Sequence, residues 1–185
     1  MTWNDITIRK FQQLKSIPAT ADEMDKACYT LSILNDKPKS YYESIPIGDL
    51  FVEYDEVSFV HQDIPKLSKN QFKIDGKRYI VHANIDGMTA EQFIIINKLT
   101  SSTDEAIANL NQLMAVITCR KHLLGKDKWS DNFKQKTQIM LDCPIVVAWN
   151  AALFFLKVRN SWLDVAQHYL EIQFQKVMKK ITKQK

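Results

Sequence analysis

Apolar residues recur every three or four positions along most of the chain, a spacing typical of amphipathic helices. The first such stretch holds Ile8, Phe11 and Leu14. Thr7 stands where a helix-capping hydroxyl is expected, and Pro18 lacks the amide that a helix needs in order to continue. The pattern therefore predicts a short helix near the start of the chain.

Two further helices are predicted before residue 65. Thr20 and Glu23 have the spacing of a capping box, which opens a helix that should end near Asn35. Ser44-Ile45-Pro46 then places a proline in the first turn of a third helix. The residues expected on its apolar face are Ile47, Leu50, Phe51, Tyr54, Val57 and Val60.

The periodicity changes to that of strands between residues 69 and 86. Asp75-Gly76, a strong turn signal, separates Phe72-Lys73-Ile74 from a second strand-like run at residues 79–83, so a β-hairpin is predicted. A lone hairpin is only marginally stable, so it should pack on helices or pair with another strand, which could come from another subunit. Its short length and polar alternation indicate that it protrudes. The candidate residues for contact with another chain are therefore Ile74, Tyr79 and Ile80.

Helical spacing returns after Gly87. Thr89 and Gln92 have capping-box spacing, and Ser102 and Glu105 repeat it. The helix behind the Ser102 box carries apolar residues at helical intervals and is expected to continue as far as residue 125, where a glycine ends it.

The last part of the chain is predicted to be one long helical segment, preceded by a helix that Ser130 or Asp131 caps. The segment runs from residue 145 to about residue 181, and Asn160-Ser161 could divide it. Its first half is apolar on nearly every side, as in a central core helix, whereas its second half is amphipathic. In that second half Lys176, Lys179, Lys180 and Lys183 lie about opposite Val177, Met178 and Ile181.

These patterns predict a mainly α fold, a helical bundle of about six or seven helices with one small β-hairpin. The length of 185 residues fits a single domain. Within it we expect N-terminal helices at 1–68, the hairpin at 69–86, and a C-terminal helical core with its basic terminal helix at 87–185. The expected core includes Phe11, Leu31, Leu50, Phe51, Ile96, Leu113, Ile117, Trp149, Leu153, Phe154 and Trp162.

The positive charge is concentrated at the C-terminal end. The 25 Lys and Arg residues and 21 Asp and Glu residues give a net charge of +4, but five lysines and no acid lie in the last ten residues. The rest of the chain is nearly neutral, so the basic balance is not that of a DNA-binding domain. The lysine face could contact phosphates or an acidic partner, or be only a solvated helix end. Glu53, Asp55 and Glu56 are expected to form a solvated acidic face.

No catalytic or metal-binding motif is complete. Cys28, Cys119 and Cys143 are too widely spaced for a metal knuckle, and their odd number favours free thiols in a reducing cytoplasm. Cys119 and His122 are three residues apart on the predicted helix, but no third catalytic group or further zinc ligand accompanies them. A buried cysteine beside a surface histidine is the simpler interpretation. No cofactor is expected, and no apolar run is long enough to span a bilayer.

Five short stretches carry a family resemblance: WNDITIRKF at residues 3–11, SIPIGDL at 44–50, IDGKRY at 74–79, IDGMTAEQF at 85–93 and LFFL at 153–156. Together they resemble small morphogenesis proteins encoded among the structural genes of tailed bacteriophages. The part from residue 74 to residue 93, a β-ribbon that leads into a Thr-capped helix, is similar to the core of tail-assembly chaperones. A helical body with a small β insertion also resembles head–tail connector and neck-ring proteins.

The resemblance implies a non-enzymatic structural or assembly protein that acts through protein–protein contacts. It would be either a ring or connector component of the virion or a chaperone in the host cytoplasm. Its partners would be other phage structural proteins and further copies of itself in a homo-oligomer or ring, with contact to packaged nucleic acid as a further expectation and no membrane. The alternative is a nucleic-acid- or host-factor-binding regulator that uses the C-terminal lysine face. An enzyme built on Cys119 and His122 is the third interpretation.

Overall fold

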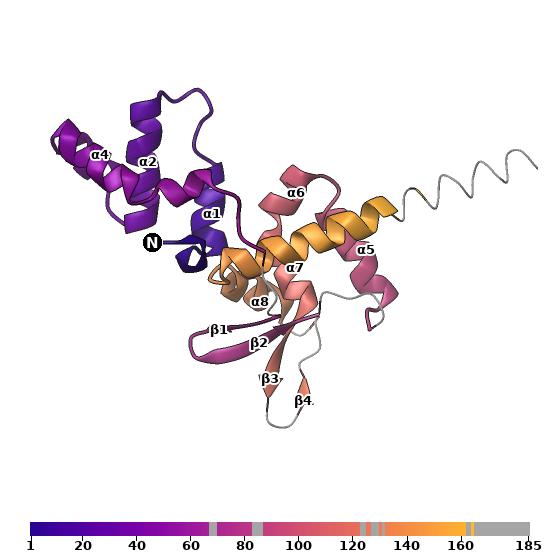
Figure 1. Ribbon diagram of the computed structural model, residues 1–185. Helices are drawn as coiled ribbons and strands as arrows, with labels where there is room; N and C mark the ends of the chain where they lie inside the picture. Colours follow the sequence, from indigo (N-terminus) through magenta and orange to yellow (C-terminus); the bar gives the residue numbers. More distant parts are fainter. Residues whose placement is uncertain are drawn as a thin grey trace, which may run out of the picture.

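The computed structural model describes residues 1–66, 70–82, 87–122, 125–126, 130, 132–161 and 164. Most of these residues are helical, and the strands form one small antiparallel sheet below the helices (Figure 1). The fold is mainly α with a small β element, which confirms the predicted fold class. The described residues hold more helices than the six or seven expected, because α3 (Lys39–Ser44) was not predicted and the stretch after Ser102 is divided into two helices.

The N-terminal half contributes short helices that gather at one end of the molecule (Figure 1). These are the 3₁₀ helix Trp3–Asp5, α1 (Ile8–Lys15), α2 (Glu23–Asn35), α3 (Lys39–Ser44), α4 (Ile47–Asp55) and the 3₁₀ helix Ser58–His61. The Thr7 hydroxyl caps α1, as predicted, by accepting a hydrogen bond from the Lys10 amide. The cap of α2 is Asp22 and not Thr20, because the Asp22 carboxylate accepts the Asp25 amide at 2.8 Å. The sequence pattern does not predict α3.

The second half holds α5 (Ala90–Leu99), α6 (Thr103–Ala108), α7 (Leu110–Ile117) and α8 (Phe133–Met140). Residues 145–161 form a further helix, which is the described part of the predicted long C-terminal segment. Thr89 and Gln92 form the predicted capping box of α5, and the Ser102 hydroxyl caps α6. The cap of α8 is Asn132, whereas the sequence suggested Ser130 or Asp131.

The sheet contains the predicted hairpin, β1 (Gln71–Ile74) and β2 (Lys77–Val81), followed by β3 (Thr118–His122) and β4 (Gly125–Lys126) in the order β1-β2-β3-β4. All three pairings are antiparallel. Asp75 and Gly76 both have positive φ, at 48° and 70°, which is the backbone of the tight turn that matches the twist of a hairpin. Glycine at the second position adopts this conformation without steric strain.

The prediction of one helix from the Ser102 box to residue 125 is wrong. Asn109 separates α6 from α7, and its side-chain amide donates back to the Glu105 carbonyl at 2.9 Å. Thr118 then adopts an extended backbone and begins β3. The run Val116-Ile117-Thr118 is β-branched, and β2 offers it a free edge, so tertiary pairing overrides the helical spacing of the apolar residues.

The hairpin does not protrude as predicted. β2 lies between β1 and β3 of the same chain, so its third strand comes from within the protein and not from another subunit. Phe72, Ile74, Tyr79 and Val81 are buried, and the Phe72 and Tyr79 rings stack with their centroids 5.5 Å apart. The alternation of polar residues therefore reflects one face packed on the core and one face in solvent.

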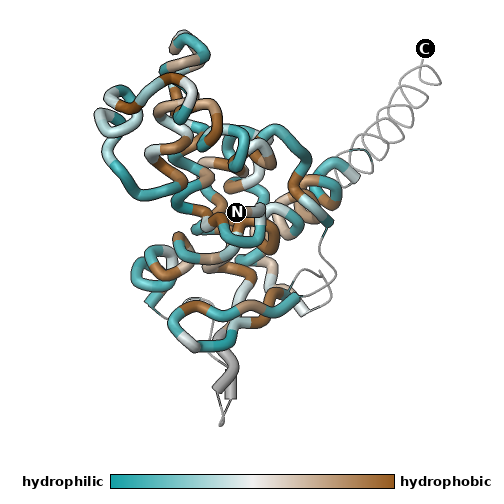
Figure 2. Tube along the Cα trace, turned by 60° about the vertical axis from the view of Figure 1, so that its left-hand side comes forward, coloured by the Kyte–Doolittle hydropathy of each residue, from teal (hydrophilic) through white to brown (hydrophobic). Residues whose placement is uncertain are grey.

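One hydrophobic core runs from the N-terminal helices to the helix of residues 145–161, and hydrophobic residues recur on the sides of the helices that face one another (Figure 2). Of the predicted core residues, Phe11, Leu31, Leu50, Ile96, Leu113 and Ile117 are buried. Trp149 and Phe154 are partly buried against the core. Phe51 and Leu153 are exposed, at 57% and 37%, so these two assignments are wrong; Phe155 is buried instead. Trp162 lies outside the described residues.

The two ends of the described chain are joined by backbone hydrogen bonds. The Ile8 amide donates to the Cys143 carbonyl at 2.9 Å, and the Ile145 amide donates to the Ile6 carbonyl at 2.7 Å. The Arg9 guanidinium also forms a salt bridge with Asp142 at 3.2 Å. This seam fixes α1 against the start of the helix of residues 145–161, and a pocket lies beside it.

Candidate functional site

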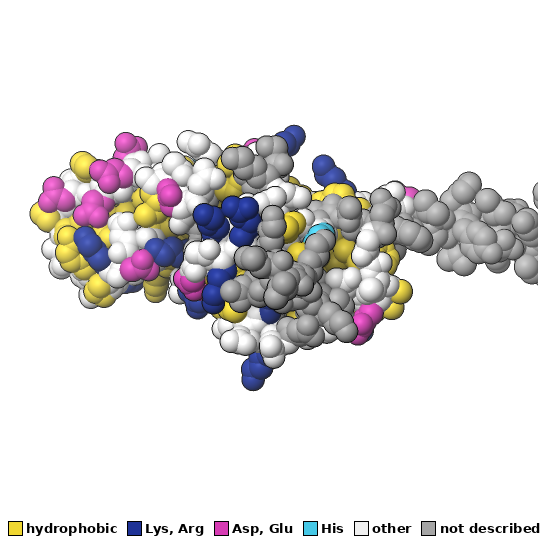
Figure 3. All heavy atoms as spheres, turned by 90° about the horizontal axis from the view of Figure 1, so that it is seen from below, with side chains coloured by type: hydrophobic (Ala, Val, Ile, Leu, Met, Phe, Trp, Pro, Cys, Tyr) yellow, Lys and Arg dark blue, Asp and Glu magenta, His cyan; other side chains and the backbone are white. Residues whose placement is uncertain are grey.

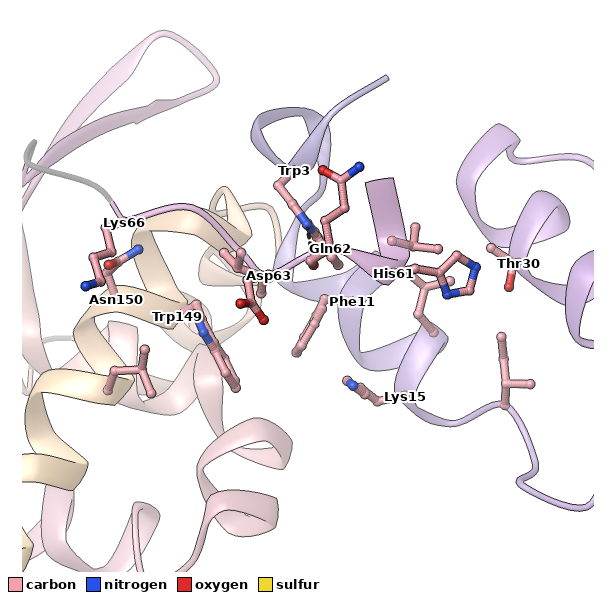
Figure 4. Close-up of a pocket in the computed structure, with 15 residues that line it drawn as sticks. Trp3, Phe11, Lys15, Thr30, His61, Gln62, Asp63, Lys66, Trp149 and Asn150 are labelled. Carbon is pink, nitrogen blue, oxygen red and sulfur yellow. Dashed lines mark hydrogen bonds between the residues drawn. The ribbon is translucent and has the colours of Figure 1, made fainter. Parts of the chain in front are cut away.

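The pocket at the seam has a volume of about 520 Å³ and is lined by residues from both ends of the chain. Figure 4 shows the aromatic side chains of Trp3, Phe11 and Trp149 around it. The ring centroids of Trp3 and Phe11 are 6.1 Å apart, and those of Phe11 and Trp149 are 5.8 Å apart. Rings at these distances pack favourably, so they form a firm apolar wall.

The polar groups of the pocket hold its walls in place. The Trp3 indole donates to the Gln62 carbonyl at 3.1 Å, and the Asn150 amide donates to the Pro65 carbonyl at 3.0 Å. His61 is 3.0 Å from the Tyr54 hydroxyl. These bonds tie residues 61–65, which cross from the N-terminal helices to the sheet, to the pocket. An apolar pocket with a few polar groups at its rim suits the side chain of a partner or a small apolar ligand, and it contains no nucleophile paired with a base.

A second candidate is a thiol–imidazole pair that the sequence did not identify. The His82 Nε2 atom lies 3.0 Å from the Cys119 Sγ atom, whereas the sequence suggested His122 as the partner. The difference follows from the strand: positions three apart share a face of a helix but not of a β-strand. Residue 82 follows β2 and residue 119 lies in β3, so the pairing of these strands brings the two side chains together.

The pair has two of the roles that covalent catalysis needs, a nucleophile and a base. Cys119 is only 6% exposed, so a substrate would reach it only if the covering residues moved. Among the described residues no group of three or more His, Cys, Asp or Glu side chains could hold a metal ion. The arrangement supplies a part-buried contact between the exposed His82 and the buried Cys119 of the neighbouring strand.

A third candidate is an apolar strip on α4, made of Ile47, Phe51 and Val52. Their exposed fractions are 58%, 57% and 64%. Ile47 and Phe51 are one helical turn apart and share a face of α4, whereas Val52 lies about 100° further around the helix from Phe51. The core-facing side of the same helix is carried by Leu50, which is 4% exposed.

An acidic row borders the α4 strip. Asp49, Glu53 and Glu56 follow one another at helical intervals on the side next to Val52, and Asp55 lies between Phe51 and Val52 around the helix. None of these four carboxylates forms a salt bridge with a described residue. Figure 3 shows acidic and hydrophobic side chains gathered at the end of the molecule that carries α2 and α4. The prediction that Glu53, Asp55 and Glu56 form an outer acidic face agrees with this placement: Asp55 and Glu56 are exposed and Glu53 is partly so.

The sequence pattern placed Ile47 and Phe51 on one apolar face with Leu50 and Tyr54, and assigned Phe51 to the core. A signal for their exposure is present, since α4 has apolar residues on two sides and only one side can face the body. Of the predicted contact residues, Ile74 and Tyr79 are buried at 6% and 4%, and Ile80 is partly buried in the middle of the sheet. Lys176, Lys179, Lys180 and Lys183 lie outside the described residues.

The buried thiols lead to a chemical prediction. Cys143 is completely buried and burial raises the pKa of its thiol, so its thiolate fraction stays small even in alkaline solution. Burial, followed by the charge of Glu43, also raises the pKa of Cys28. We expect iodoacetamide to leave Cys143 unmodified in the native protein at pH 9, and to modify it quickly in guanidinium chloride. Mass spectrometry of tryptic peptides measures both, and rapid native modification of Cys143 would contradict this packing.

None of the described helices combines the length and the apolar character that a membrane span requires. Comparison of the chain with protein-family models, with curated proteins and with solved structures finds no significant match in any of the three.

Proposed function

We propose that the protein is a non-enzymatic structural or assembly protein of a tailed bacteriophage, acting through protein–protein contacts in the tail or the head–tail connector. The observation that carries the proposal is the α4 strip. Three large apolar side chains, each more than half exposed, lie on one short helix at the end of the molecule. Exposed apolar side chains gathered on one element of a small protein favour a site of protein–protein contact.

The family resemblance supplies the phage context of the proposal. It rests on the short motifs at residues 3–11, 44–50, 74–79, 85–93 and 153–156. The motif at 44–50 leads directly into the α4 strip, and the motif at 74–79 forms the turn of the β1–β2 hairpin. A chaperone would use the strip to shield a tail protein before polymerisation, whereas a ring or connector component would use it as a permanent interface.

Mass spectrometry of purified particles tests the proposal and separates its two forms. A stoichiometric amount of the protein in the particles identifies a ring or connector component, present in the virion. Absence from particles, combined with recovery of tail proteins bound to it from infected cells, identifies a chaperone located in the host cytoplasm. Absence from both would overturn the proposal.

A single substitution tests whether the α4 strip is responsible for the presence of the protein in particles or in tail-protein complexes. Replacing Phe51 with Glu puts a charge in the centre of the apolar surface, so we expect the protein to keep its fold and to disappear from particles or from tail-protein complexes. Ile94→Glu is the matched control, because Ile94 is 55% exposed on α5, away from α4. Circular dichroism should show all three proteins folded. Equal incorporation of both variants would show that the strip is not the contact surface.

A further inference from the structure

The surface around the α4 strip is acidic over a long stretch of chain. Residues 40–65 contain six Asp and Glu residues and no Lys or Arg. The acidic row of Asp49, Glu53 and Glu56 lies directly beside the apolar strip and has no salt-bridge partner among the described residues. A complementary partner would therefore present apolar side chains together with several positive charges.

The chain itself contains a segment of that chemistry. Residues 170–185, which we call the C-terminal basic segment, carry five of the lysines and a single acid, Glu171. The sequence predicts an apolar side made of Leu170, Phe174, Val177, Met178 and Ile181. Long lysine side chains can extend around the edge of such a side to reach neighbouring carboxylates. We infer that the C-terminal basic segment of one copy docks on the α4 strip of a second copy. This inference rests on the proposed function, in which the α4 strip is a protein–protein contact surface.

The occupant is assigned to a second copy because the described chain leads away from its own α4. The helix of residues 145–161 runs away from α4, which lies beyond the other end of that helix (Figure 1).

Docking of this kind joins two different surfaces: the C-terminal basic segment of one copy contacts the α4 strip of another copy. Reciprocal docking between two copies produces a closed dimer, whereas docking from each copy to the next produces a ring when the rotation between copies closes and a filament when it does not. The inference thus gives a physical route to the ring expected of a connector component.

A peptide of residues 165–185, labelled with a fluorophore, tests the contact directly by fluorescence anisotropy with the full-length protein. With the protein diluted until it is monomeric, so that the strips are not occupied by neighbouring copies, we expect binding to the wild type, at least about tenfold weaker binding to Phe51→Glu, and unchanged binding to Ile94→Glu. Binding should also weaken as salt is raised, because exposed charges are screened. Equal binding to the wild type and to Phe51→Glu would overturn the inference.

Charge reversal tests the contact between whole chains. One variant carries Asp49→Lys, Glu53→Lys and Glu56→Lys, and the other carries Lys176→Glu, Lys179→Glu, Lys180→Glu and Lys183→Glu. Each variant alone places like charges at the interface and should sediment as a monomer in analytical ultracentrifugation. Mixing the two restores opposite charges at every contact, so the mixture should associate as the wild type does. Failure of the mixture to associate overturns the inference.

The remaining outcomes distinguish a failure of the contact between copies from a failure of the proposed phage function. If the wild type is monomeric, and the peptide binds the lysine-reversed variant but not the wild type, the segment covers its own α4 and the second-copy inference is overturned. If the protein occurs in particles while the peptide shows no preference for the intact strip, the inference fails and the proposed function stands. If the peptide binds the strip but the protein is absent from particles and from tail-protein complexes, the contact between copies stands and the phage function fails.

Discussion

Proline in place of Ile80 should unfold the sheet rather than disturb an association with another chain. The Val81 amide donates to the Asn70 carbonyl on the β1 side, and the His82 amide donates to the Ile117 carbonyl on the β3 side. By the two-residue alternation of a strand, the Ile80 amide also faces β3. Proline removes that donor from the centre of the sheet and leaves the facing carbonyl without its partner, so we expect a loss of at least about 2 kcal/mol of unfolding free energy. Urea unfolding followed by circular dichroism measures it.

Lys73→Pro is the matched control for Ile80→Pro. Because the Asn70 carbonyl faces β2, the same alternation directs the Lys73 amide away from β2, toward the outer edge of β1. Proline is tolerated at such edge positions, so this variant should lose much less stability than Ile80→Pro. If Ile80→Pro were as stable as the wild type and only association were lost, the hairpin would be an external contact element and the packing described above would be incorrect.

Shortening Leu113 to alanine should have the second large effect. Leu113 lies in α7 and is completely buried in the core. Removing most of its side chain leaves a cavity that the surrounding helices cannot fully close, at a cost of about 2–5 kcal/mol. For a protein of this size the corresponding fall in melting temperature is about 5–15 °C. Differential scanning calorimetry measures the fall.

Phe51→Ala provides the contrast, because the sequence pattern assigns Phe51 and Leu113 to the core alike. Phe51 is 57% exposed on α4, so its truncation should change the stability of the isolated chain by no more than about 0.5 kcal/mol. A destabilisation of Phe51→Ala as large as that of Leu113→Ala would show that the α4 strip is covered in the isolated protein.

The local signals in the sequence identified most of the helix starts and the hairpin. Thr7, Thr89 and Ser102 cap the helices they were expected to cap, because a hydroxyl that accepts an amide from the first helical turn acts over three residues and needs no tertiary contact. The Asp75-Gly76 turn is local in the same sense. β3 was missed because it depends on pairing with β2, about forty residues earlier in the chain, and no local pattern carries that information.

The candidate surfaces were harder to find from the sequence. The seam pocket combines Trp3 and Phe11 with Trp149, and only the folded chain brings these together. The Cys119–His82 contact has the same origin, since two strands must pair before the side chains meet. The α4 strip was visible as an apolar pattern, but periodicity alone does not distinguish a face that packs on the body from a second face that does not.

The seam between the two ends of the chain also bears on the order of events during synthesis. The partners of the Ile6 carbonyl and the Ile8 amide are Ile145 and Cys143, which leave the ribosome late. At about 5–20 residues per second, α1 waits on the order of ten seconds for them. During that interval Ile8 and Phe11, both buried in the finished protein, lack the surface that finally covers them. The nascent N-terminal helices therefore expose apolar surface during synthesis, and the seam can close only after residue 145 has left the ribosome.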